Sequence, residues 1–178
     1  MATVVSDSGP LIHLAQINKL QVLQKLFGCI VVTPSVKVEV VDEVILRNFP
    51  DAEVAAEAFK KGWIIVETLS ERALEQAANL AGGEGISPAD AQVIILAEKK
   101  KALFLSDDNA LSKIAEMYGL KTSDTWSILF EALSRNLVTL TELTEAVDEL
   151  GKKKFRLNAK QTQEILDAAR SIDKRRKQ

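Results

Sequence analysis

Aspartates follow two apolar stretches of the sequence, at positions where a buried strand would end. Asp7 follows residues 3–5 and Asp107 and Asp108 follow residues 103–105, in each case after one intervening serine. The carboxyl ends of parallel strands meet at one edge of a sheet, where open α/β folds bind their ligands. Carboxylates gathered there raise one another's pKa, and a hard divalent cation relieves the repulsion. Oxygen ligands without a His or Cys partner favour Mg²⁺ or Mn²⁺ over Zn²⁺.

Each acid also has a purely structural explanation as a helix cap. Asp7 could cap a helix that begins near Pro10, and Asp108 and Asp124 could cap the helices that follow them. Asp90 stands three residues after Ser87, a spacing similar to a capping box. It reaches the same edge as Asp7 only if its helix begins on that side. Taken one at a time, the acids leave both interpretations open.

Apolar runs alternate with helical patterns along most of the chain, which predicts a mainly parallel sheet with right-handed crossovers. Residues 36–46 fit either a strand or a helix, and the start signal at Pro34 favours the helix. A glycine-rich loop is expected at residues 82–85. We expect a sheet domain over residues 1–135 and a helical C-terminal extension over 136–178. The strand-like runs are residues 3–5, 29–33, 63–66, 103–105 and 120–122.

Composition is that of an ordinary globular protein, with 178 residues, 47% of them hydrophobic, and a net charge of -2. That charge gives no overall basic field, so binding of nucleic acid would need local patches. The single cysteine, Cys29, excludes an intrachain disulfide, suits the cytoplasm and is expected in the core. We expect neither a secretory signal nor a membrane span. The lone His13 is interpreted as a partly packed helix residue rather than a ligand or a base.

Four short motifs in this order resemble those of the PIN domain family, in particular the prokaryotic PIN-like nucleases that serve as toxins in toxin-antitoxin modules. The resemblance covers residues 2–135, and the tail is similar to a helical extension found in one branch. The motifs are VVSDSGPLI at residues 4–12, VTPSV with Glu39 and Val40 after it, ADAQ at 89–92 leading into ILA at 95–97, and FLSDD at 104–108.

The resemblance implies a three-layer α/β/α sandwich and assigns site residues. It maps the first three family acids to Asp7, Glu39 and Asp90. The fourth maps to Asp108, with the adjacent Asp107 as the alternative, and Asp124 matches a weaker fifth position. Ser8 and Ser106 match small hydroxyl residues that orient such a site. Glu39 could equally be a solvated acid beside a Val-rich face.

The resemblance implies a metal-dependent endoribonuclease in which one or two Mg²⁺ or Mn²⁺ ions activate a water for attack on RNA. RNA, an antitoxin protein and a second copy in a homodimer are the expected partners, with no membrane. Peripheral lysines such as Lys37 and Lys113 would contact the RNA. An interaction protein that keeps the fold without catalysis is the main alternative. A receiver or phosphatase-like phosphoryl-transfer domain fits less well, because Asp7 has neither an adjacent acid nor an Asp at position 9.

Overall fold

The computed structural model describes residues 3–42, 51–153, 155 and 157–178. Its chain divides into two compact units, Met1–Asp124 and Thr125–Gln178. The first unit holds the sheet, and the second is helical in its described part. The sequence predicts the boundary between the two parts at residue 135. In the structure, the helix after residue 124 belongs to the second unit.

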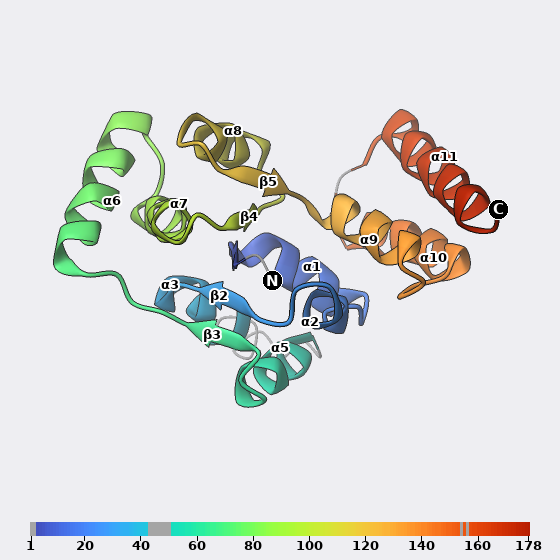
Figure 1. Cartoon of the computed structure of the whole chain (residues 1–178), viewed down its shortest axis with the longest axis horizontal. Helices are drawn as coiled ribbons and strands as arrows, with labels where there is room; N and C mark the ends of the chain where they lie inside the picture. The colour runs from blue at the N-terminus through green and yellow to red at the C-terminus, as the bar shows by residue number, and fades with distance from the viewer. Residues whose placement is uncertain (1–2, 43–50, 154, 156) are drawn as a thin grey trace. The chain divides into compact units, whose positions relative to one another are not determined.

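Parallel strands form the centre of the first unit (Figure 1). In the described part of the chain there are five, and their spatial order is β3-β2-β1-β4-β5. β1 is thus central, pairing with β2 through Val5 and Val31 and with β4 through Val5 and Phe104. Both faces must be covered, which explains the nearly continuous apolar strands. The strands are β1 (Val4–Ser6), β2 (Ile30–Val32), β3 (Ile64–Val66), β4 (Leu103–Leu105) and β5 (Lys121–Ser123).

The helices that lie between β1 and β3 in the sequence cover one face of the sheet. The helices that lie between β3 and β5 in the sequence cover the opposite face (Figure 1). Right-handed crossovers dictate this, because the chain moves one way from β1 to β3 and the other way from β3 to β5. The expected three-layer α/β/α sandwich is confirmed. The first face has α1 (Ser8–Gln16), α2 (Gln21–Phe27), α3 (Pro34–Lys37), the π-helix η1 (Val38–Asp42) and α5 (Asp51–Lys60), and the second has α6 (Glu71–Glu84), α7 (Pro88–Lys100) and α8 (Asn109–Met117).

The ambiguous segment after β2 is helical as far as the structure describes it. Thr33 caps α3 by accepting from the Val36 N–H, and Pro34 occupies the first helical position. The helix continues into η1 up to Asp42. The helix predicted over 36–46 is therefore confirmed to Asp42, and residues 43–46 lie outside the described part.

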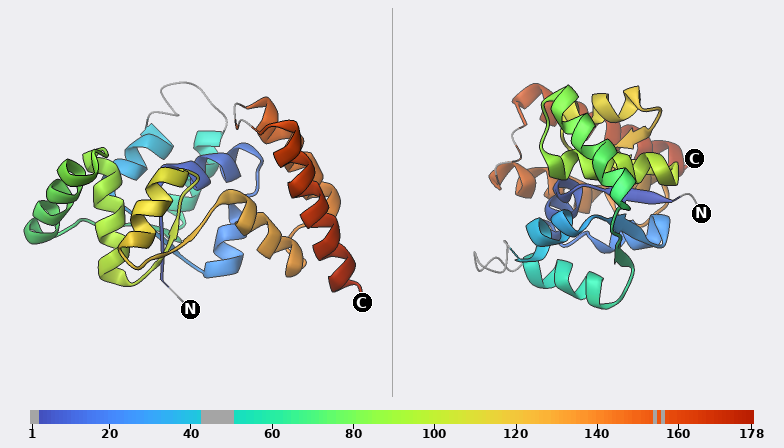
Figure 2. Two further views of the ribbon diagram at one scale, coloured as in Figure 1. Left: turned by 90° about the horizontal axis from the view of Figure 1, so that it is seen from above. Right: turned by 90° about the vertical axis from the view of Figure 1, so that its left-hand side faces the viewer.

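Two local predictions are wrong. The glycine-rich loop at 82–85 is mostly helix, because α6 continues to Glu84 and packs against α7, which it crosses (Figure 2). Gly85, with a φ of 67°, ends it in the left-handed conformation that glycine adopts easily. Cys29 is exposed rather than in the core, because β2 begins one residue later, at Ile30.

The second unit consists of α9 (Thr125–Ser134), α10 (Leu140–Lys152) and α11 (Ala159–Arg176). Hydrogen bonds join the C-terminal end of α11 to the C-terminal end of α9. Arg176 donates from Nη1 to the Leu133 carbonyl at 3.2 Å and to Asn136 Oδ1 at 2.5 Å. Arg176 and Lys177 also pair with the buried Asp173. Hydrogen bonds from Lys177 and Arg176 lower the pKa of Asp173, although its burial opposes them. Part of the basic tail is therefore structural.

Candidate active site

The chain changes direction in the sheet at β1, which has β2 on one side and β4 on the other. In open α/β folds, ligands bind at such a switch point, outside the carboxyl ends of the strands. Asp7 follows β1 and Ser106 and Asp107 follow β4, so these residues meet at that point. The Asp7 N–H donates to the Leu105 carbonyl at 3.0 Å, which continues the ladder one residue past β1. The strands thus bring together two segments about a hundred residues apart.

The Asp7 side chain is held by two donors. Its Oδ1 accepts from the Gly9 N–H at 2.9 Å and so caps α1, as its structural interpretation predicts. Its Oδ2 accepts from the Ser106 hydroxyl at 2.5 Å. The Ser106 Oγ in turn accepts from the Asp108 N–H at 3.1 Å. Ser106 therefore links the Asp7 carboxylate to the turn after β4, and its role in orienting a site stays a prediction.

The Asp7 carboxyl has a pKa raised from 3.8 to about 7. Burial is the largest cause, since only 9% of the residue is exposed, and burial disfavours the charged form. The hydrogen bonds from Ser106 and Gly9 oppose this shift, whereas the negative charges of Asp107 and Asp90 add to it. Asp7 therefore lies within electrostatic range of two further acids.

Asp107 lies beside Asp7, against the first turn of α1. A Cβ built on Gly9 would be 3.4 Å from Asp7 Oδ1 and 3.6 Å from Asp107 Oδ2, so both carboxylates face this glycine. Asp107 Oδ2 also lies 2.6 Å from Nδ1 of His13 on α1. The His13 side chain is partly buried, as expected, but no sequence pattern predicted its contact with a residue 94 positions away.

Asp108 is oriented differently from its neighbour. Its Oδ1 accepts from the N–H groups of Ala110 and Leu111, which caps α8, and the residue is exposed. Asp90 also serves a cap: its N–H donates to the Ser87 hydroxyl, which donates to Asp90 Oδ2 at 2.7 Å. α7 contacts β1 and β4, and its first turn reaches the edge where Asp7 lies. Asp90 thus meets the condition that the sequence left open.

The remaining predicted residues lie on elements around this edge. Ser8 is the first residue of α1, and Glu39 is a half-buried residue of η1, which contacts α1. Asp124 follows β5, the strand beside β4, and is half-buried. The structure places these residues at the carboxyl side of the sheet, and their roles stay predictions.

The donors suit a hard cation, because they are carboxylate oxygens and because the buried Asp7 carries charge that its acidic neighbours do not balance. Among the described residues, no three His, Cys, Asp or Glu side chains are close enough together to hold a metal ion. Mg²⁺ is commonly bound through one or two carboxylates and keeps several waters. Asp7 and Asp107 fit such a site without a third direct protein ligand.

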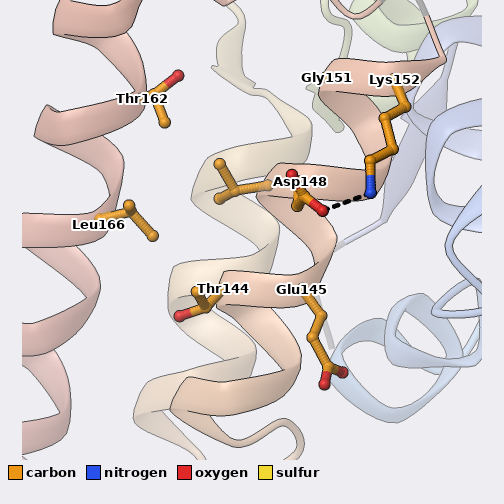
Figure 3. Close-up of a pocket in the computed structure, with 8 residues that line it drawn as sticks. Thr144, Glu145, Asp148, Gly151, Lys152, Thr162 and Leu166 are labelled. Atoms are coloured by element: carbon orange, nitrogen blue, oxygen red, sulfur yellow. Dashed lines mark hydrogen bonds and ion pairs between the residues drawn. The ribbon is translucent and has the colours of Figure 1, made fainter.

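A separate cavity of about 590 Å³ lies between α10 and α11 in the second unit (Figure 3). Thr144 and Val147 of α10 line it together with Thr162 and Leu166 of α11, and an ion pair joins Asp148 to Lys152 at 2.6 Å. The described residues that line it include none of the predicted site acids.

Among the described helices, none is long and apolar enough to cross a membrane.

The first unit is an α/β/α sandwich with acids gathered at its switch point. A family model, DUF3368, described as a PIN domain, matches residues 3–171, and the chain belongs to the PIN domain family. The match includes most of the second unit. PIN domains are generally nucleases and typically use divalent metal ions.

Comparison of structures gives the same fold. The chain is similar to the crystal structure of PAE2754 from Pyrobaculum aerophilum, with a TM-score of 0.56 and 16% sequence identity over 73% of this chain and 96% of that one. At this identity the likeness concerns the fold alone. No curated protein matches the chain.

Proposed function

We propose that this protein is a metal-dependent endoribonuclease whose site is built around Asp7. The observation that supports this most is the meeting of Asp7, Asp107 and Asp90, from three different elements, at the switch point of a PIN-domain sheet. A buried carboxylate beside other acids costs stability unless a cation or a proton balances it. A site for Mg²⁺ or Mn²⁺ explains why this arrangement exists.

In this proposal Asp7 and Asp107 hold the ion, and Asp90 and Glu39 add negative charge around it. We assign the fourth family position to Asp107, because its enclosed carboxylate lies beside Asp7 at Gly9, whereas Asp108 is exposed and directed to the start of α8. The chemistry that such an ion supplies is a lowered pKa for an attacking water and stabilisation of charge on the phosphate oxygens.

The protein itself orients the site through Ser106, which keeps Asp7 Oδ2 in place. Ser8 and Asp124 are assigned supporting positions, the latter as a further acid. Exposed cations such as Lys37 and Lys113 would contact the RNA backbone. Lys154 and Arg156, also candidates for RNA contact, lie outside the described residues.

We further propose that the protein is the toxin of a toxin-antitoxin module, acting in the cytoplasm, with an antitoxin and a second copy of the chain as partners. The support is the resemblance of its motifs to toxin-type PIN nucleases. Induced expression should then arrest growth of a bacterial host, whereas Asp7→Asn should not. Equal arrest by both proteins would contradict a toxin that works by cleavage.

A PIN-fold interaction protein without catalysis is the second candidate. It is favoured by the lack of a three-ligand metal group among the described side chains. It would bind its partners equally well with or without Mg²⁺, and Asp7→Asn would leave this binding intact. A receiver-like phosphoryl-transfer domain is disfavoured by the family to which the chain belongs.

Cleavage of labelled single-stranded RNA, with DNA of the same sequence in parallel, tests the proposal. Wild-type protein should cut RNA with Mg²⁺ or Mn²⁺ and should stop when chelator is added. Asp107→Asn should lower the rate by about 100-fold or more, because the loss of a direct ligand should cost at least as much as the loss of an outer-shell partner. Asp108→Asn is the matched control, because Asn also caps helices and should leave the rate within a few-fold of wild type.

Loss of cleavage in Asp108→Asn but not in Asp107→Asn would refute our choice of the fourth acid. Metal-dependent cleavage that survives both Asp7→Asn and Asp90→Asn would refute the site as a whole. Absence of cleavage of any RNA or DNA, in preparations free of copurified protein, would favour the interaction protein.

A further inference from the structure

The Asp107 carboxylate packs against one face of α1. Gly9 and His13 are four residues apart on this helix, so they lie on the same side, one turn apart. Asp107 contacts both: its Oδ2 lies 3.6 Å from the Cβ position of Gly9 and 2.6 Å from Nδ1 of His13. The side chain of Asp107 is only 9% exposed, so it is enclosed rather than turned toward solvent.

Nδ1 of His13 and Oδ2 of Asp107 share a hydrogen bond. A carboxylate that binds a metal ion is ionised and has no proton to donate, so in the proposed site Nδ1 of the imidazole is the donor and Asp107 Oδ2 the acceptor. At 2.6 Å it is at the short end of charge-assisted hydrogen bonds. A partly buried imidazole that donates to a carboxylate fixes the orientation of that carboxylate.

Asp107 needs such a restraint because of its neighbours. The negative charge of Asp107 raises the pKa of Asp7, so the two side chains repel each other when both are ionised. Repulsion of this kind favours rotamers that move Asp107 away from Asp7, and the contact with His13 opposes such a movement. The contact with His13, and the absence of a side chain at Gly9, keep the two acids together.

We infer that His13 is a positioning residue, which holds Asp107 beside Asp7 so that both carboxylates can bind one divalent cation. This inference rests on the proposed function and adds a residue outside the five acids and two serines assigned there. His13 acts through Asp107 and does not itself contact the ion. Its loss should therefore weaken cation binding without preventing the protein from folding.

Binding of Mn²⁺, measured by calorimetry and by the loss of the free-ion EPR signal, tests this without reference to cleavage. His13→Leu removes the donor and should weaken Mn²⁺ binding by about 10- to 100-fold, the usual effect of losing a group that orients a metal ligand. His13→Asn keeps an N–H donor near the place of Nδ1 and should restore binding to within a few-fold of wild type. In the Asp107→Asn background, His13→Leu should weaken binding no further.

The same proteins without metal report on the contact itself. His13 is the sequence's only histidine, so its ring nitrogen signals in a long-range ¹H–¹⁵N spectrum need no further assignment. When the His13 imidazole of wild-type protein is uncharged, we expect its proton on Nδ1. We expect Asp107→Ala to shift these signals and Asp108→Asn to leave them unchanged. Circular dichroism of each variant shows that the protein is folded.

Three results would overturn the inference. His13→Leu that binds Mn²⁺ as wild type does would show that the contact is not needed, while leaving the proposed metal site intact. His13→Asn as weak as a folded His13→Leu would show that the ring matters for packing and not as a donor. Wild-type protein that binds no Mn²⁺ would refute the proposed metal site and this inference together.

Discussion

Asp7→Asn should make the free energy of unfolding less dependent on pH, because it removes a buried carboxyl whose pKa is raised. The pKa of Asp7 is raised from 3.8 to about 7 in the folded protein, mainly by burial. At 1.36 kcal/mol for each pKa unit, the full difference corresponds to about 4 kcal/mol. Because the residue is only 9% exposed, solvent screens this cost little.

The sign follows from where the proton is bound. Between pH 3.8 and about 7 the folded protein keeps the Asp7 proton while the unfolded chain has lost it, so the folded state binds more protons. The contribution of Asp7 to stability is therefore complete below pH 3.8 and is lost as the pH rises through about 7. Between about pH 5 and about pH 8 the metal-free wild type should lose roughly 2–3 kcal/mol from this group.

Urea denaturation in chelator at these two pH values measures the effect. Asn has no proton to lose, so the stability of Asp7→Asn relative to wild type should improve by roughly 2–3 kcal/mol on going from the acidic to the alkaline pH. Any loss of hydrogen bonds to Gly9 or Ser106 cancels in this comparison, because it is the same at both pH values.

Divalent cations supply the control. At the alkaline pH, Mg²⁺ or Mn²⁺ at about a hundred times its dissociation constant should stabilise the wild type by about 2.7 kcal/mol and Asp7→Asn much less. If the difference in stability between the two proteins is the same at both pH values, Asp7 is not a buried acid of raised pKa. If both are stabilised equally by the cation, Asp7 is not its ligand.

Other substitutions test separate parts of the fold and site. Gly9→Ala should leave stability within about 1 kcal/mol of wild type by urea denaturation, because its methyl group meets only ordinary contacts, yet it should weaken Mn²⁺ binding by lying against both carboxylates. Arg176→Ala should cost the second unit about 1–3 kcal/mol in thermal unfolding through lost charged hydrogen bonds, whereas the exposed Lys174→Ala should cost little; equal losses would contradict the proposed fastening of α11. Phe104→Ala, fully buried in the central sheet, should cost about 3–5 kcal/mol, against almost nothing for Met117→Ala, which is 73% exposed.

Local signals in the sequence predicted the elements well because the core is continuous and the caps are of common types. Ser87 caps α7 and Pro88 lies in its first turn, and Gly28, with a φ of 80°, ends α2. The end of α6 was not predictable, since glycines stand at 82, 83 and 85 and only the last adopts the left-handed conformation. Packing of Leu80 and neighbouring residues against α7 keeps the earlier glycines helical despite their low helix propensity.

The site was less accessible from the sequence, because its contacts are between distant residues. Adjacent aspartates at 107 and 108 are equivalent in the sequence, and only the turn after β4 directs one toward Asp7 and the other toward α8. The contact of His13 with Asp107 depends on the placement of α1 beside the turn after β4, which no local pattern encodes. The parallel-sheet prediction placed the ends of β1 and β4 at the same edge of the sheet, but it did not predict that these two strands pair.

An acid can cap a helix and also belong to the candidate site. The burial of an acid therefore distinguishes site residues from ordinary helix caps better than capping does. Asp7 caps α1 with one oxygen while the other is held by Ser106, and Asp90 forms a cap within electrostatic range of Asp7. Asp108 caps α8 from an exposed position, where a charged cap is inexpensive to hydrate. Asp7 and Asp107 are enclosed beside one another, and helix capping explains neither their burial nor their proximity. The energetic cost of this pair is therefore the feature that distinguishes the candidate site from ordinary helix ends.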